Sequence, residues 1–280
     1  MLITITFSSR QEVMSLHKKL SLAKMKSLHM ELKDQTLKIE ATIKERTCRT
    51  ELIKLFIDFI MDMFEKKWLV DILENQFYFK YPEEKEEILD IVYAIFDGEK
   101  EDLPDVEHLP NRREIIARDL DEIFLHSSTF SFESLKTFRL SKYRACLRRY
   151  VELAIDEYKL QQEYLTFVDK LRRIIRSYRS LHHTIYVLDD KPFRLFDENH
   201  KLIQNTHSIR SFYPLLKQWG IDAEPSILLT LIGLAPQYVN VYTDRPDTGM
   251  MRTLKHVFEE RVQFFPRQKK ISTEKVLNPK

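Results

Sequence analysis

Four basic residues late in the chain recur at a spacing that suits the recognition of phosphate. They are separated by steps of four, three and four residues, which return to nearly the same angle around a helix: Arg172, Arg176, Arg179 and His183. With Tyr178 available to stack on bases, one interpretation is a partner or nucleic-acid face. The other is structural, because arginine stems cover the edge of an apolar core while their charged ends stay in water. The sequence pI of about 8.3 favours the structural interpretation, since dedicated nucleic-acid domains lie above about 9.

Two histidines and two aspartates near this stripe supply the residue types of a metal or acid–base site. The adjacent His182 and His183, however, would point in different directions from either a helix or a strand. Asp189 and Asp190 are typical of a hairpin turn. We therefore predict a turn here rather than a metal site.

A nucleophilic dyad would require a base beside a nucleophile. His126 is followed by Ser127 and Ser128, but neighbours in sequence rarely supply that geometry, and the sequence contains no nucleophile elbow. We interpret this segment as the end of a helix.

Glycine is scarce, with four in 280 residues, whereas ordinary usage near 7% would give about twenty. The four stand apart from one another, at Gly98, Gly220, Gly233 and Gly249. Neither a GxGxxG turn nor a P-loop fits this sequence, which excludes the dinucleotide and nucleoside-triphosphate enzymes that need them. We predict no catalytic residue, no cofactor and no metal, and we favour a binding protein over an enzyme.

Cysteine usage and hydropathy are typical of a reduced, cytoplasmic, soluble protein. Cys48 and Cys146 are about a hundred residues apart without a CxxC partner, so neither a disulfide framework nor a zinc site is indicated. The first seven residues lack the basic start of a secretion signal. The longest apolar stretch, residues 52–64, carries charged side chains throughout, so we expect no insertion into a membrane.

The formal net charge of +2 conceals opposite charges along the chain. Residues 51–130 hold 9 basic against 21 acidic side chains, a balance of −12, so the other 200 residues balance to +14. Residues 131–180 alone hold 12 basic against 6 acidic side chains. Such blocks either steer a partner at long range or neutralise each other within the fold.

Hydrophobic periodicity predicts an α+β fold with a predominantly helical middle region. The N-terminal segment, residues 1–45, alternates with a period of two at 3–7 and again at 37–43. Ser9 and Glu12 form a capping box for the helix between these strands, which gives β-α-β. The strands either join the C-terminal sheet or form a module of their own.

The helical domain is expected over residues 46–180. From Cys48 onward the apolar period changes from two to about 3.6. Between Pro110 and Pro192, 81 residues contain neither glycine nor proline, which favours long helices. The apolar stripe changes phase near Gln161, which predicts a bend or a break there.

A small C-terminal α/β domain is expected over residues 181–265, with a β-hairpin and a β-α-β crossover. Its elements are a hairpin of strands 184–188 and 193–196, a helix at 226–234, a strand at 238–242, a helix at 250–260 capped by Asp247, and a strand at 262–265. Residues 266–280 hold five basic side chains against one acidic one and are interpreted as a flexible basic tail.

Five short segments, in a fixed order, resemble a known family. They are FRLSKY at 138–143, QQEYLTFVDKL at 161–171, IYVLDDKPFRLFDE at 185–198, LLTLIGLAPQYVNVYTD at 228–244 and LKHVFEERVQF at 254–264. In these segments the chain resembles the YtxC-like family of sporulation proteins, most clearly from about residue 130 to 265. The matching positions are Phe138, Arg139, Tyr143, Glu163, Tyr164 and Phe167, and the resemblance assigns no known role to any of them.

The resemblance implies a role in endospore formation and implies no reaction, cofactor or partner. We favour a non-enzymatic protein that binds another protein, which predicts an exposed apolar patch. The alternative is nucleic-acid binding, which predicts that the arginine stripe faces solvent away from acidic groups. An enzyme would need a deep pocket with converging ionisable groups, with the best residues for it at His182, His183 and Asp189. The oligomeric state stays open.

Overall fold

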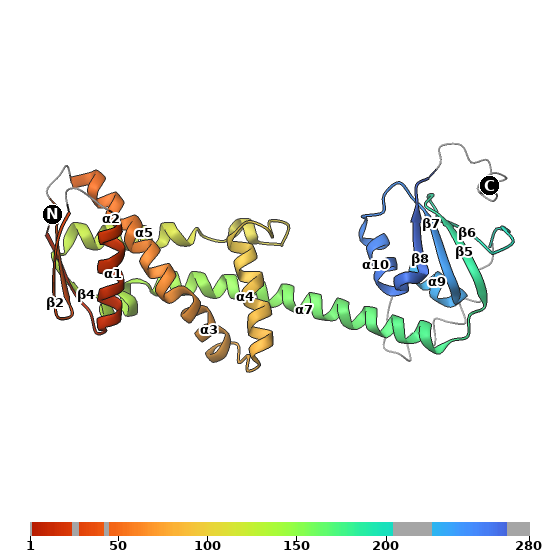
Figure 1. The fold of residues 1–280 in the computed structure, drawn as a ribbon, viewed down its shortest axis with the longest axis horizontal. Coiled ribbons are helices and arrows are strands. Elements are labelled where there is room, and N and C mark those ends of the chain that lie inside the picture. The colour runs from red at the N-terminus through yellow and green to blue at the C-terminus, as the bar shows by residue number, and fades with distance from the viewer. Residues whose placement is uncertain (1, 24–27, 42–44, 204–225, 268–280) are drawn as a thin grey trace. The chain divides into compact units, whose positions relative to one another are not determined.

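The computed structural model describes residues 2–23, 28–41, 45–203 and 226–267 (Figure 1). The chain forms two compact units, Met1–Leu160 and Gln161–Lys280, which we call unit 1 and unit 2. The division falls inside the long helix α7 (Ser141–Ser177). The α+β class with a helical middle is confirmed.

Unit 1 begins with a four-stranded sheet and a helix packed on it (Figure 1). The elements are β1 (Leu2–Thr6), α1 (Arg10–Leu22), β2 (Leu28–Lys33), β3 (Thr36–Ala41) and β4 (Thr129–Ser131), in strand order β2-β3-β1-β4. β1 pairs antiparallel with β3 and parallel with β4. Ile3 and Ile5 of β1 are fully buried, as alternation predicts for a strand with one face on the core. The N-terminal strands thus pair within unit 1 and do not join the C-terminal sheet.

Two strands of this sheet, β2 and β4, are not among the expected elements. β4 is only three residues long and carries no strong apolar signal, whereas the alternation of apolar and polar residues in β2 (LHMELK) is a strand signal in its own right. The expected capping box at Ser9 is wrong, because Ser9 makes no capping hydrogen bond with its side chain and Glu12 pairs with Lys136 at 2.9 Å instead. Residues 24 and 42–43, the ends of the expected helix and second strand, lie outside the described residues.

Helices fill the remainder of unit 1. They are α2 (Glu45–Ile60), the π-helical turn η1 (Met61–Glu65), α3 (Lys66–Asn75), α4 (Pro82–Phe96), the 3₁₀ turn η2 (Val106–His108), α5 (Arg112–His126), α6 (Phe132–Ser134) and the π-helical turn η3 (Leu135–Arg139). α4 has Pro82 in its first turn, as predicted, and Gly98 follows its end at φ +76°. Phe56, Phe59 and Phe132 are among the largest side chains of a core that gathers residues from the sheet and the helices.

Unit 2 consists of the last part of α7 packed on a second four-stranded sheet. Its other elements are β5 (His182–Leu188), β6 (Arg194–Phe196), α9 (Ile227–Leu234), β7 (Pro236–Tyr242), α10 (Gly249–Phe258), the 3₁₀ turn η4 (Glu259–Arg261) and β8 (Val262–Phe265), in strand order β6-β5-β7-β8. β5 and β6 form the expected antiparallel hairpin, and β7-α10-β8 forms the expected parallel crossover. Asp247 does not cap α10, because Thr248 occupies the N-cap position. Of the expected tail, residues 268–280 lie outside the described residues.

The sequence predicted a bend or a break near Gln161, and of these the break is wrong, because α7 is one continuous helix. The apolar stripe changes phase there because α7 contributes Ile155 to the core of unit 1 and Val168 to the core of unit 2. A change of core requires a new helical face but no interruption of the backbone. Within the described residues no helix combines the length and the hydropathy that a membrane span requires.

Candidate functional site

An open groove of about 590 Å³ runs between α2 and α5 of unit 1. Its floor consists of Ile53, Ile57 and Ala117, of which the two isoleucines are buried at 7% and 4% exposure. Ala117 contributes only a methyl group where longer side chains stand on either side, which leaves the space between the helices unfilled. We call this feature the α2–α5 groove.

Helical spacing places each wall of the groove. On α2 the lining follows Arg49, Ile53 and Ile57, and on α5 it follows Arg113 and Ala117, with steps of four residues that keep each set on one face. Such a pattern turns one stripe of each helix toward the other. The two helices therefore face each other along several turns, and the groove follows the line between them.

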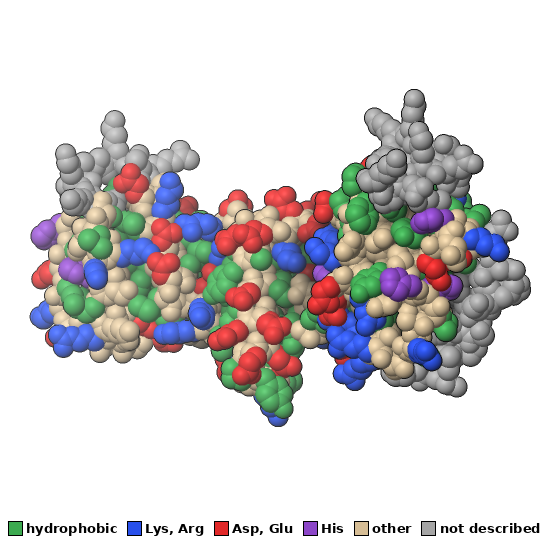
Figure 2. All heavy atoms as spheres, turned by 45° about the vertical axis from the view of Figure 1, so that its right-hand side comes forward, with side chains coloured by type: hydrophobic (Ala, Val, Ile, Leu, Met, Phe, Trp, Pro, Cys, Tyr) green, Lys and Arg blue, Asp and Glu red, His purple; other side chains and the backbone are tan. Residues whose placement is uncertain are grey.

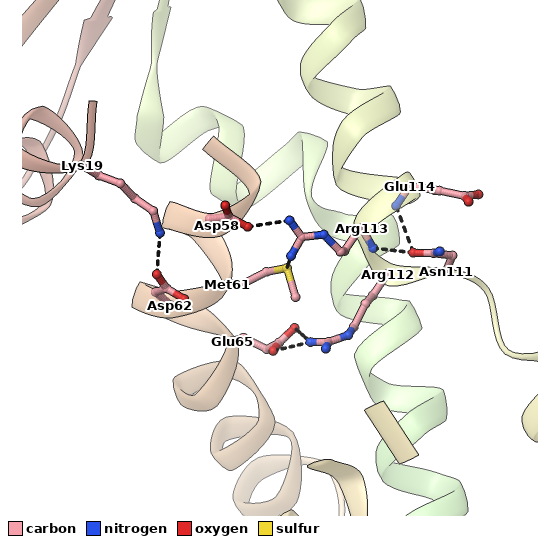
Figure 3. Close-up of polar contacts among 9 residues, drawn as sticks. All are labelled: Lys19, Asp58, Met61, Asp62, Glu65, Asn111, Arg112, Arg113 and Glu114. Carbon is pink, nitrogen blue, oxygen red and sulfur yellow. Dashed lines mark hydrogen bonds and ion pairs between the residues drawn. The ribbon is translucent and has the colours of Figure 1, made fainter. Parts of the chain in front are cut away.

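Ion pairs join the two walls at both ends of the groove. Arg49 Nε lies 2.9 Å from Asp121 Oδ1, and Arg113 Nη2 lies 2.5 Å from Asp58 Oδ1 (Figure 3). The start of α2 therefore lies beside the end of α5, so the helices run antiparallel. The side chain of Asn111 caps α5 by accepting hydrogen bonds from the backbone N–H groups of Arg113 and Glu114.

A buried carboxylate holds the first residue of α5 against η1. Glu65 is 6% exposed, and its two oxygens lie 2.6 and 2.7 Å from Arg112 Nη1 (Figure 3). Tyr143 of α7 donates a hydrogen bond to the same carboxylate. Burial, reinforced by the Glu65 charge, raises the pKa of Tyr143. The Arg112 guanidinium also lies 3.6 Å from the ring centroid of Phe96.

The charge of the α2–α5 groove is opposite to that of the segment around it. Four cations, Arg49, Lys54, Arg113 and Arg118, line the groove against the carboxylates of Glu114 and Asp121. Lys54 and Arg118 are exposed, stand on opposite walls and have no ion-pair partner among the described residues. Residues 51–130, which supply most of these side chains, carry a balance of −12.

The basic stripe is only partly helical. α7 ends at Ser177, so Arg179 lies in the connection beyond it and His183 lies in β5, and neither shares a helical face with Arg172 and Arg176. Arg172 Nε and Arg176 Nη2 lie 3.3 and 3.1 Å from the two carboxylate oxygens of Glu259. Since a nucleic-acid face requires these arginines away from acidic groups, the expected stripe is wrong and the interpretation as a structural ion-pair network is favoured.

The histidines and aspartates of β5 do not converge on a common site. His182 Nδ1 lies 3.3 Å from Glu198, and the exposed His183 lies beside Thr184 and Tyr238. Asp189, at the other end of the strand and roughly 20 Å away, is buried and accepts a hydrogen bond of 2.6 Å from Thr243. The described residues contain no group of three or more His, Cys, Asp or Glu side chains that could hold a metal ion.

Two further sequence interpretations concern the turn and the helix end. Asp190, which follows Asp189 in the hairpin turn, pairs with Arg194 at 2.6 Å and with Arg267. The turn predicted at these aspartates is thus confirmed. α5 ends at His126 and Ser127 occupies its C-cap position, so the helix end predicted there is also confirmed.

The family-matching positions are divided between the two units. Phe138, Arg139 and Tyr143 lie in unit 1, and Glu163, Tyr164 and Phe167 lie in unit 2. Among them Phe138 is 71% exposed, and Arg139 lies 3.6 Å from Glu122. Tyr164 Oη lies 2.8 Å from His256 Nδ1 and ties α7 to α10. Tyr143 contacts Glu65, the partner of Arg112 at the start of α5.

The sequence reasoning did not identify the α2–α5 groove. Its cations come from two distant parts of the sequence, such as Lys54 and Arg118, and share one groove only through the packing of two helices. The one signal in the sequence is Ala117, a small residue among the larger side chains of α5. This signal is weak, because alanine is also the commonest helix former.

Comparisons with known proteins agree with the resemblance described above. The model of the YtxC-like family matches residues 50–263, from α2 to β8. The chain is 31% identical over 217 residues to the "Uncharacterized protein YtxC" of Bacillus subtilis (strain 168), which covers 76% of this chain and 75% of the relative. No solved structure matches the chain. The extent of these matches shows that the chain belongs to the YtxC-like family.

Proposed function

We propose that this chain is a non-enzymatic, cytoplasmic sporulation protein that acts by binding another protein in the α2–α5 groove. The observation that carries the proposal is the α2–α5 groove, whose apolar floor of Ile53, Ile57 and Ala117 is flanked by the unpaired cations Lys54 and Arg118. A concave site with an apolar floor and a charged margin matches the apolar centre and polar rim of protein interfaces.

Two features favour this proposal over the alternatives. Arg172 and Arg176 both pair with Glu259, so the charge available to hold a nucleic acid is reduced. Most of the ionisable side chains of the groove are bound in cross-groove ion pairs or exposed to water, which suits a binding surface. The sporulation role rests on the family alone.

A variant that fills the groove tests the proposal. Ala117→Trp places an indole over the floor, and Ala145→Trp makes the same change at an exposed position of α7 as a control. A photoreactive residue at Glu114, in the groove, is compared with one at the exposed Glu86 of α4 during crosslinking in sporulating cells.

The proposal expects one defined protein to be crosslinked from Glu114 but not from Glu86. Ala117→Trp should abolish that product and Ala145→Trp should leave it unchanged, with both variants folded by circular dichroism. The same product from Ala117→Trp, or no product from Glu114, would overturn the proposal. If Ala117→Trp fails to fold, the proposal is still tested by whether the crosslinked product forms from Glu114 and not from Glu86.

A further inference from the structure

From the walls and charges of the α2–α5 groove we infer the chemistry of its occupant: an acidic amphipathic helix of a partner protein. This inference rests on the proposed function, because it specifies what the same groove binds. The apolar side of the helix would lie on Ile53, Ile57 and Ala117, and its carboxylates would face Lys54 and Arg118.

The dimensions of the groove suit a short helix. The lining extends over eight residue steps on each wall, from Arg49 to Ile57 and from Arg113 to Asp121, which at 1.5 Å per residue is about 12 Å. This length corresponds to roughly two helical turns. An occupant of two or three turns would present two or three apolar side chains to the floor at i, i+3 or i+4, and i+7.

The backbone of the walls favours a helix over an extended peptide. Both walls are α-helices, whose backbone N–H and C=O groups are already hydrogen-bonded within each helix. An extended peptide lying on an apolar floor would therefore find no edge with which to pair its own backbone, and buried unpaired backbone groups are costly. A helix satisfies its backbone internally and needs only side-chain contacts.

The unpaired cations select for negative charge. Arg49 and Arg113 are already paired across the ends of the groove, whereas Lys54 and Arg118 stand on opposite walls without an ion-pair partner among the described residues. An occupant removes water from both of these cations, which is unfavourable unless it supplies carboxylates in return. A neutral or basic helix would thus bind less tightly than an acidic one.

A second copy of this chain does not fit the description through its most acidic helix. Acidic side chains gather over α4 in unit 1 (Figure 2), among them the exposed Glu83, Glu86 and Asp90. The apolar side of α4, however, is buried in the core of unit 1 through Ile88 and Val92. α4 can therefore offer carboxylates but no apolar face to the floor of another groove.

Binding of two synthetic peptides to the full chain tests the inference. Both are amphipathic helices of about 14 residues with leucine on one face; one carries glutamate on the other face and one carries lysine. Affinity is measured by fluorescence anisotropy for the wild type, for Lys54→Glu/Arg118→Glu and for Ala117→Trp. The control is Lys66→Glu/Lys67→Glu, which makes the same charge change on α3, outside the groove.

We expect the acidic peptide to bind the wild type and the α3 control equally, and to lose affinity about tenfold or more in both groove variants. Raising the salt concentration should weaken its binding, and the basic peptide should bind better to Lys54→Glu/Arg118→Glu than to the wild type. All four substituted cations are exposed, so folding should be retained.

The inference is overturned if the acidic peptide binds the wild type more weakly than about 1 mM, if the basic peptide binds equally well, or if the α3 control loses affinity to the same extent. These outcomes leave the proposed function standing when a cellular protein is still crosslinked from Glu114. The absence of that crosslinked product, by contrast, removes the proposed function itself.

Discussion

Arg112, the first residue of α5, donates through one guanidinium nitrogen to both oxygens of Glu65, the last residue of the π-helical turn that follows α2, at 2.6 and 2.7 Å. The same carboxylate accepts a hydrogen bond from Tyr143 of α7. Three helical segments thus meet at one buried charge just beyond the end of the α2–α5 groove.

Removal of Arg112 should destabilise unit 1 strongly. Arg112→Met keeps a long side chain but leaves the buried Glu65 carboxylate without its cation, and breaking a buried ion pair in this way costs about 3–5 kcal/mol. The measurement is urea unfolding at neutral pH. The exposed Arg148, which pairs with Glu152 at 3.0 Å, gives the matched control, and Arg148→Met should cost less than about 1 kcal/mol.

A double variant separates the cost of an unpaired buried charge from the cost of the altered side-chain shapes. Glu65→Gln combined with Arg112→Met removes both charges, so it should recover part of the stability that Arg112→Met loses. Equal losses for the single and the double variant would contradict the assignment of the cost to an unpaired buried carboxylate.

Alkaline pH should destabilise the protein partly through Cys146. This thiol is 3% exposed, and burial raises its pKa from 9.0 to about 11. Because the folded state holds the proton more tightly, the stabilisation is complete below pH 9 and declines as the pH rises toward 11. The decline from this group alone amounts to about 2–3 kcal/mol.

Cys146→Ala tests this pH dependence. Urea unfolding of the wild type and the variant between pH 8 and about pH 11 should give stability curves that converge as the pH rises. The Cys146 thiolate also helps to raise the pKa values of Tyr143 and Tyr150, so the difference between the two curves includes this coupling. Parallel curves would show that the thiol keeps its proton equally well in the unfolded chain.

Parts of this fold follow from local patterns in the sequence. β1 and β5 alternate, α4 is marked by Pro82 and Gly98, and the absence of glycine and proline favours the long α7. The end of α7 at Ser177 has no such mark. It coincides with tertiary hydrogen bonds, since the backbone N–H of Leu181 donates to Ala235 O at 3.0 Å as β5 begins to pair with β7.

The α2–α5 groove illustrates the same limit more strongly. Ile53 and Ala117 appear in the sequence as ordinary members of two amphipathic helices, and nothing local indicates that they share a floor. The basic residues around Arg172 show the opposite case, because their regular spacing predicted a binding face that the structure does not form. Their acidic partner, Glu259, is 83 residues from Arg176 in the sequence. In both cases the decisive neighbours are brought together by tertiary packing, which local patterns do not show.

Residues 1–160 should fold without the remainder of the chain. The buried core of unit 1 ends at Ile155, and that of unit 2 begins at Val168, so the cores share no residue. A fragment ending at Leu160 should show a helical circular dichroism spectrum and a cooperative thermal transition. A fragment that melts without cooperativity would contradict the independence of the two cores.

Loss of the Thr243 hydroxyl should destabilise unit 2. Thr243 is 3% exposed, donates a hydrogen bond of 2.6 Å to the buried Asp189 and accepts one of 3.0 Å from the backbone N–H of Arg245. Thr243→Val keeps the shape but removes both bonds, and Arg245, 3.3 Å from Asp189, is too exposed to compensate. The expected cost is about 1–3 kcal/mol in the free energy of unfolding.

The exposed Thr166 of α7 provides the control, because Thr166→Val changes the same atoms in water and should cost less than about 0.5 kcal/mol. Equal effects of the two substitutions would mean that the Asp189 carboxylate finds another donor once Thr243 is gone, and that the carboxyl ends of β5 and β7 are held together by Arg245 and the backbone alone.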